Sequence, residues 1–250
     1  MTPSSPAIET AGLAKRYGDN AALAPIDLVV PLGQRVSLIG HNGSGKTTLI
    51  KLLAGLLDPS DGTATICGHS TGTPDARAAL SYLSDQPVFY DDLTVRQHLE
   101  YVARLHHTEG WEDQADWLIE SVGLRARADD LPATFSRGLK QKAAIAMAFV
   151  RPFELMLIDE PFVGLDRIGR EALLELIGWA HDDGATLVVA THELASVTSS
   201  DRLIALSDGG VIFDGDPGVA DPAALADGWF DTTASDEALE ADRPDDEIGH

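Results

Sequence analysis

The stretch RVSLIGHNGSGKTTLIKLLAGL, residues 35–56, decides the fold. Arg35–Ile39 is mostly apolar and predicts a β-strand, and Thr47–Leu56 predicts a helix. The loop between them fits the pattern Gly-x-x-x-x-Gly-Lys-Ser/Thr in the strand–loop–helix context that this pattern requires. Glycines let such a loop fold so that successive backbone N–H groups point inward, and the helix adds the positive end of its dipole. The stretch therefore predicts a phosphate-binding loop.

Individual residues of this loop have expected contacts with a nucleoside triphosphate. Lys46 can reach the oxygens of the β- and γ-phosphates, and the Thr47 hydroxyl can bind Mg²⁺. The nucleotide-binding residues that we predict here are Gly40, His41, Asn42, Gly43, Ser44, Gly45, Lys46, Thr47 and Thr48. The loop indicates that a nucleoside triphosphate binds, but it does not indicate what the triphosphate is used for.

Two carboxylates follow another predicted strand. Leu155–Ile158 is wholly apolar, as expected for a strand covered on both faces, and Asp159 and Glu160 come next. In an open parallel sheet, ligands bind at the carboxyl ends of the strands. Asp159 can hold Mg²⁺ there, and Glu160 can polarise a water molecule in line with the γ-phosphate. His192 follows the apolar run Thr186–Ala190, so we expect it at the same edge, within reach of the γ-phosphate.

The composition of the chain excludes several functions. Lys and Arg number 18 and Asp and Glu 40, which gives a formal net charge of −22. A negative field repels phosphate backbones, so we expect no nucleic-acid partner. The chain is 44% apolar, which is enough for a full core and excludes global disorder. Its longest apolar run, Ala143–Val150, is far shorter than the roughly 20 residues that span a bilayer. A membrane connection is therefore expected to come through a partner.

Short β-type runs alternate with helical patterns, and this order predicts an α/β fold with a largely parallel sheet. Further strands are predicted at Ile8–Leu13 and Leu28–Val30, with Pro31–Gly33 as the turn after the second. A helix is predicted at Thr94–Leu105, because its first residues form a Thr-x-x-Gln capping box. Residues 87–150 are mostly helical in pattern and predict a helical lobe beside the sheet.

A third motif, FSRGLKQK at Phe135–Lys142, lies between the phosphate loop and the two carboxylates. At this place the ATP-binding subunits of ABC transporters carry a signature that usually reads Leu-Ser-Gly-Gly-Gln. From the order of these motifs, the chain resembles such a subunit over residues 7–217. The resemblance implies that Ser136 and Gly138 contact the γ-phosphate of ATP held by a second subunit. An arginine replaces the first glycine of the signature, and a leucine replaces its glutamine.

The resemblance assigns further residues to the nucleotide site. By position in the family's motifs, Tyr17 would stack on adenine, and Gln86 would touch Mg²⁺ or the attacking water and border the transporter contact. Asp166 closes the segment Gly164-Leu165-Asp166, which resembles the D-loop of the family, and it is assigned to nucleotide binding. The catalytic residues implied are Glu160, His192 and Gln86, and the metal ligands implied are Thr47, Gln86 and Asp159.

The same resemblance implies the architecture. We expect an α/β P-loop NTPase core with a mostly parallel sheet, an N-terminal antiparallel β part and an inserted helical subdomain. Residues 1–217 would form this ATP-binding domain, with the helical subdomain at residues 87–150. Residues 218–250 would be an acidic extension that is at least partly disordered, because the segment is rich in Asp, Glu, Pro and Ala and poor in core residues.

The expected function is ATP hydrolysis that powers a separate membrane-spanning subunit. The family geometry implies a homo- or heterodimer of ATP-binding subunits with two ATP molecules between them, peripheral to the cytoplasmic face of the cell membrane. The variant signature resembles that of exporters of small molecules, lipids or haem-like cargo. One alternative is a non-transport ABC ATPase that acts on a cytosolic or division complex. A phosphate-loop kinase is another, but it would leave Ser136 and Glu160 unexplained.

Overall fold

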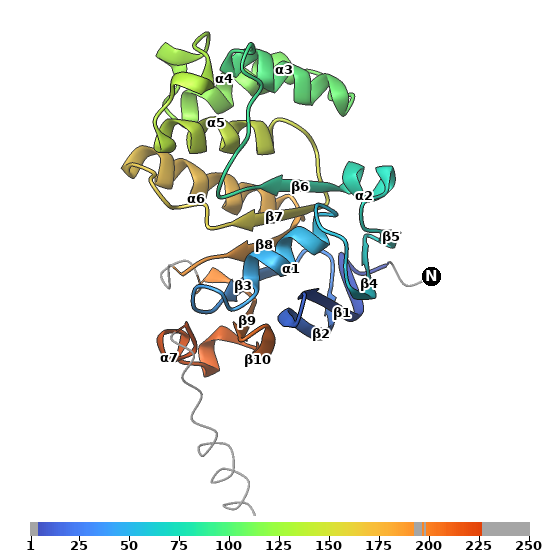
Figure 1. The fold of residues 1–250 in the computed structure, drawn as a ribbon. Helices are drawn as coiled ribbons and strands as arrows, with labels where there is room; N and C mark the ends of the chain where they lie inside the picture. The colour runs from blue at the N-terminus through green and yellow to red at the C-terminus, as the bar shows by residue number, and fades with distance from the viewer. Residues whose placement is uncertain (1–4, 193–196, 198, 227–250) are drawn as a thin grey trace, which may run out of the picture.

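The computed structural model describes residues 5–192, 197 and 199–226, whose strands form two sheets (Figure 1). The first sheet is antiparallel, has the order β2-β1-β4-β5, and contains β1 (Ile8–Tyr17), β2 (Asn20–Val30), β4 (Asp61–Ile66) and β5 (His69–Ser70). The second sheet has the order β10-β9-β3-β8-β7-β6 and contains β3 (Arg35–Ile39), β6 (Leu80–Leu83), β7 (Leu155–Asp159), β8 (Thr186–Ala190), β9 (Arg202–Ser207) and β10 (Gly210–Gly215). Its neighbouring strands pair in parallel, apart from the antiparallel pair β9 and β10.

The helices gather in distinct places around these sheets. In Figure 1, α3 (Val95–Leu105), α4 (Trp111–Ser121) and α5 (Arg137–Phe149) lie together beyond the β6 edge of the second sheet. The remaining helices, which contact the strands, are α1 (Lys46–Leu53), α2 (Pro74–Ala79), α6 (Arg167–Asp182) and α7 (Pro222–Ala226). Within the described part of the chain, every helix is too short or too polar to cross a membrane.

The central strands are buried on both faces, as their apolar sequences predict. On β7, Met156 and Ile158 join the core shared with α3–α6, whereas Leu155 and Leu157 join the core shared with α1 and the antiparallel sheet. Successive side chains of a strand point to opposite faces, so a wholly apolar strand supplies both cores at once. The polar residues that follow β7 and β8 are thereby left at the carboxyl edge of the sheet.

The predicted fold class is confirmed, and most predicted elements lie where expected. β3 and β8 span the predicted residues, and Thr94 is the N-cap of α3 with a complete capping box. The helix after the phosphate loop ends at Leu53, before the predicted end, because Gly55 takes the left-handed φ of 67° that terminates helices. The turn at Pro31–Gly33 joins strands of different sheets, since β2 and β3 do not pair.

In the described part of the segment after residue 217, Leu225 joins the core, and Ala220 and Ala226 pack against the same cluster. Leu225 of α7 is buried in a small cluster with Ile39 and Leu203. The composition of this segment did not predict the contact, because a single leucine among Pro, Ala and Asp forms no periodic pattern. The acidic stretch 227–250, which holds most of the predicted extension, lies outside the described residues.

Candidate active site

The phosphate loop lines a cavity of about 590 Å³. Residues 42–48 contribute to its wall, together with residues 20–22, Asp85, Glu160 and Asp208. The loop begins where β3 ends, and Glu160 follows the end of β7, so the cavity lies at the carboxyl edge of the parallel strands. This is the edge at which open α/β sheets bind their ligands.

The glycines of the loop permit a backbone path that other residues would block. Gly40 has a φ of 146°, and a Cβ there would lie only 2.2 Å from the Leu206 carbonyl oxygen. Gly45, directly before α1, has a φ of 106°. Glycine adopts such positive φ values without steric cost. The loop is therefore pressed against β9 at its start, and within the loop the Ser44 N–H donates to the His41 carbonyl oxygen at 3.1 Å.

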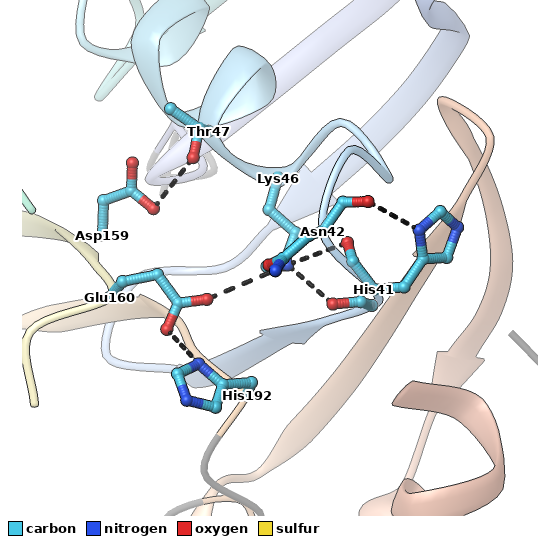
Figure 2. Close-up of polar contacts among 8 residues, drawn as sticks. His41, Asn42, Lys46, Thr47, Asp159, Glu160 and His192 are labelled. Atoms are coloured by element: carbon cyan, nitrogen blue, oxygen red, sulfur yellow. Dashed lines mark hydrogen bonds and ion pairs between the residues drawn. The ribbon is translucent and has the colours of Figure 1, made fainter. Parts of the chain in front are cut away.

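Lys46 is almost fully buried and folds back over its own loop (Figure 2). Its Nζ donates to the carbonyl oxygens of Gly40 at 2.6 Å and His41 at 3.3 Å, and lies 3.9 Å from Oε1 of Glu160. Burial lowers the pKa of Lys46, and the charges of Glu160 and Asp159 oppose this shift. Charged phosphate oxygens bind an ammonium group more strongly than neutral carbonyls do, so Lys46 can exchange these contacts for a phosphate.

Thr47 and Asp159 meet where α1 begins and β7 ends (Figure 2). The Thr47 hydroxyl donates to Oδ1 of the fully buried Asp159 at 3.3 Å, and Oδ2 of Asp159 has no hydrogen-bond partner among the described residues. Burial raises the pKa of Asp159 to about 6; the hydrogen bond from Thr47 lowers it, and the charges of Asp85 and Glu160 raise it. A buried carboxylate oxygen without a partner fits a divalent cation, which prefers oxygen ligands.

Glu160 leaves the line of β7 through an unusual backbone conformation. Its φ is 44°, in the left-handed region that residues other than glycine rarely adopt, and its N–H donates to the Ala190 carbonyl oxygen at 2.9 Å. The carboxylate is thereby aimed at Lys46 and His192, and its Oε2 lies 2.7 Å from Nδ1 of His192 (Figure 2). Such strain, about 1–3 kcal/mol per residue, concentrates at functional sites. The sequence predicted the meeting of these residues but not the conformation that aims them.

The residues of the signature form a second group that does not line this cavity. Ser136 is the N-cap of α5, and Gly138 approaches the turn before α6 so closely that a Cβ would lie 2.4 Å from the Gly164 carbonyl oxygen. Asp166 caps α6 by accepting from the Gly169 N–H at 2.8 Å, and its other oxygen accepts from Nζ of the buried Lys142 at 2.7 Å.

The hydrogen bond from Lys142, followed by the one from the Gly169 N–H, lowers the pKa of Asp166. Ser136, Gly138 and Asp166 are thus held together by contacts within their own chain. The structure therefore places Ser136, Gly138 and Asp166 at the start of α5 and α6, apart from the residues of the cavity.

Several other predicted residues also lie outside the cavity wall. Gly40, His41, Asp159 and His192 adjoin it through contacts with Lys46, Thr47 and Glu160. Tyr17, at the end of β1, is exposed, with Nζ of Lys15 at 5.3 Å from its ring centre. Gln86 is exposed as well, and its amide donates to Oδ2 of Asp85 at 3.3 Å. Asp85, which the sequence analysis did not select, lines the cavity. Its place just after β6, at the same carboxyl edge as Asp159, is the signal that could have identified it.

A larger cavity of about 960 Å³, which we call the groove, shares Asp85 with the first. It runs between the segment 84–89 and parts of α1, α2, α3 and α5. Arg151 lines it and is almost fully buried: its Nη1 donates to the Ala78 carbonyl oxygen and lies 3.0 Å from Nδ1 of His106. Burial lowers the pKa of Arg151 to about 10, which keeps it charged at neutral pH. A cation at the C-terminal ends of α2 and α3 is favoured by the helix dipoles.

The chain matches the family described as ABC transporter over residues 23–163. EcsA of Bacillus subtilis (strain 168), an ABC-type transporter ATP-binding protein, is 36% identical over 78% of this chain and 81% of its own length. The aliphatic sulfonates import ATP-binding protein SsuB 2 of Pseudomonas aeruginosa (strain UCBPP-PA14) is 35% identical over 81% of this chain and 73% of its own. The macrolide export ATP-binding/permease protein MacB 1 of Aeromonas hydrophila is 32% identical over 84% of this chain and 34% of its own.

Two solved structures resemble the whole arrangement. The ATP-binding subunit of an ABC transporter superposes with a TM-score of 0.79 at 32% identity and covers 94% of this chain and 99% of that chain. A dimeric ATP-binding cassette in a post-hydrolysis state, with ADP and Pi bound, superposes with a TM-score of 0.76 at 26% identity and covers 84% of this chain and 98% of that chain. Both alignments extend well beyond the phosphate loop.

Proposed function

This chain belongs to the ABC transporter family, as an ATP-binding subunit that hydrolyses ATP, and we propose that the cavity at its phosphate loop is the catalytic site. We further propose that hydrolysis there powers export through a separate membrane-spanning subunit. One observation carries the proposal: Lys46, Glu160 and His192 meet at the carboxyl ends of β3, β7 and β8, where the phosphate loop lines the cavity.

In the proposed site, the phosphates lie along residues 40–48, and Lys46 exchanges its loop carbonyls for phosphate oxygens. Glu160 orients and polarises the attacking water, and His192 holds the Glu160 carboxylate through the 2.7 Å contact. Tyr17 is exposed at the end of β1 and can stack on the base. The assignments of Lys46 and Glu160 share one support: Oε1 of Glu160, the residue after β7, lies 3.9 Å from Nζ of Lys46.

Thr47, on the cavity wall, and Asp159, its hydrogen-bond partner, fit Mg²⁺. The Thr47 hydroxyl and the Asp159 carboxylate would hold the ion, because Oδ2 of Asp159 is buried without a partner among the described residues. When bound, the cation neutralises charge on the phosphate oxygens. Without a cation, the buried carboxylate carries an unfavourable desolvation cost, which the raised pKa of Asp159 reflects.

A second ATP-binding subunit would complete the site. Ser136, Gly138 and Asp166 do not line the cavity of their own chain, so we assign Ser136 and Gly138 to the ATP held by another copy or a similar subunit. Ser136 caps α5, and the first turn of α5 contains no acidic residue. The N-terminal end of that helix therefore presents a positive dipole to an anion. The dimeric relative with ADP and Pi bound supports this arrangement.

We assign the groove to the membrane-spanning subunit. The groove adjoins the cavity through Asp85, and its rim includes Gln86 and the strongly exposed Val88. The signature supports the export direction, because Arg137 and Leu139 replace the usual glycine and glutamine, as in the exporter signatures that it resembles. Names of related proteins include both import and export, so the direction is a question for experiment.

The Glu160→Gln variant tests the catalytic assignment. Loss of a general base typically lowers the rate roughly 10²–10⁴-fold, while binding of the nonhydrolysable analogue AMP-PNP should be retained. ATPase assays measure the first effect and calorimetry the second. Turnover like that of the wild type in Glu160→Gln would contradict the proposed role of this carboxylate.

A pull-down in detergent, followed by mass spectrometry, tests the coupling. Recovery of a polytopic membrane protein supports the transporter, whereas recovery of ribosomal or division proteins supports the alternative of a non-transport ATPase. With the membrane subunit in inside-out vesicles, ATP added outside should drive cargo into the lumen for an exporter. Cargo movement out of the vesicles would instead establish import.

A further inference from the structure

We propose that Asp85, and not Gln86, is the residue after β6 that binds the divalent cation of the nucleotide site. The inference rests on the ATP-hydrolysing site proposed above and adds a third protein ligand to Thr47 and Asp159. It replaces the neutral amide that the family resemblance assigns with a carboxylate.

Of these two neighbouring residues, only Asp85 lines the nucleotide cavity. Asp85 is half-buried and lines both the nucleotide cavity and the groove, whereas Gln86 is exposed and lines the groove alone. Ser84 holds this arrangement, since its hydroxyl donates to Oδ1 of Asp85 at 3.4 Å and accepts from the Gln86 N–H at 3.1 Å. The Gln86 amide in turn donates to Oδ2 of Asp85 at 3.3 Å. The carboxylate therefore reaches the nucleotide cavity, and the amide supports it from the groove.

Asp85 lies on the same cavity wall as Thr47, whose hydroxyl donates to Oδ1 of Asp159 at 3.3 Å. The other oxygen of Asp159 is buried without a hydrogen-bond partner among the described residues. A divalent cation at this wall would take oxygen ligands from both carboxylates, which otherwise repel each other.

The proposed ligands, Thr47, Asp85 and Asp159, suit a cation that binds together with the nucleotide. Among the residues that the structure describes, no three His, Cys, Asp or Glu side chains come close enough to hold a metal on their own. Mg²⁺ does not require such a group, because it usually takes one or two carboxylates and completes its octahedron with phosphate oxygens and water. A carboxylate at position 85 adds a negative charge that an amide lacks. Nucleotide binding should therefore depend more strongly on the cation.

Calorimetry with AMP-PNP, in Mg²⁺ and in EDTA, tests this inference without turnover. The ratio of the two affinities measures the coupling between cation and nucleotide. In Asp85→Asn we expect the ratio to fall roughly tenfold or more, the lower end of losses on removing groups that support a metal site. Part of the fall should come from tighter binding in EDTA, because a carboxylate facing the phosphates is removed.

Two matched variants test whether the effect is specific to Asp85. One removes the neighbouring amide, and the other removes a nearby negative charge. Gln86→Ala should lower the ratio less than Asp85→Asn does, because the amide would act on the cation only through its hydrogen bond to Asp85. Asp91→Asn should keep the wild-type ratio, since it removes a charge from an exposed residue of the same segment that lines neither cavity. An unchanged ratio in Asp85→Asn, or a loss in Gln86→Ala alone, would overturn the inference while leaving the proposed function intact. A wild-type chain that binds AMP-PNP in neither condition would overturn the proposed function and this inference with it.

Discussion

Replacing Gly138 with alanine should destabilise the chain without altering the nucleotide cavity. Gly138 is the second residue of α5, and a Cβ there would lie 2.4 Å from the Gly164 carbonyl oxygen. The obstacle is backbone, so α5 and the turn before α6 must move apart. Overpacking of this kind costs about 1–3 kcal/mol, and alanine recovers up to about 1 kcal/mol of helix propensity. Because backbone blocks the Cβ, we take the upper part of that cost, about 2–3 kcal/mol. Subtracting about 1 kcal/mol of helix propensity leaves a fall of about 1–2 kcal/mol in the free energy of unfolding.

Urea unfolding of the nucleotide-free chain measures this change, with Gly178→Ala as the matched control. Gly178 lies within α6, and nothing comes within 4 Å of its Cβ position. The same substitution there should raise the free energy of unfolding by about 1 kcal/mol. AMP-PNP affinity of the monomer should be unchanged in both variants, because neither glycine lines the nucleotide cavity of its own chain. ATPase activity should fall only in Gly138→Ala. If Gly138→Ala were as stable as the wild type, the close approach to Gly164 would be refuted.

Three further substitutions test the hydrogen bonds of Lys46, Arg151 and Asp166. Lys46→Ala should weaken AMP-PNP binding roughly 10- to 100-fold by calorimetry, the size expected for a lost charged hydrogen bond; unchanged affinity would contradict its phosphate contact. Arg151→Met should lower the urea-derived free energy of unfolding by about 1–3 kcal/mol, because it leaves the carbonyls at the end of α2 without their donor, while AMP-PNP affinity stays unchanged. Asp166→Asn keeps the cap of α6 but loses the charge beside Lys142. The folded-state pKa of Asp166 is lowered, so its stabilisation is present above the unfolded value of about 3.9 and is lost as the pH falls through the folded value. Urea unfolding should therefore show a stability difference from the wild type at pH 7 that shrinks below pH 4, and a difference constant down to pH 3 would contradict the ion pair.

The parts of the site that could be predicted each depend on a short stretch of sequence. The signals for strand, glycine loop and helix are contiguous in residues 35–56, so no distant contact is needed to recognise a phosphate loop. The apolar runs at Leu155–Ile158 and Thr186–Ala190 are long enough to define buried strands. Parallel pairing then brings Glu160 and His192 to one edge.

The parts that could not be predicted depend on irregular backbone or on segments far apart in the chain. Asp85 and Gln86 lie in a segment without periodic structure, so no pattern indicates which of them faces the nucleotide. The left-handed φ of Glu160 and the close approach of Gly138 to Gly164 have no local signal either. The turn at Pro31–Gly33 was recognised, but strand pairing across two sheets is a long-range property.

The sequence by itself determined the chemistry of this protein: a phosphate loop, two carboxylates, a histidine and a signature in the order of an ABC transporter ATP-binding subunit. The tertiary structure alone decided which side chain of each segment faces which cavity. The physical reason is that burial constrains regular elements at every second residue of a strand or at each turn of a helix, and a sequence records that repeat. Loops have no such repeat, so contacts with distant parts of the backbone decide where their side chains point.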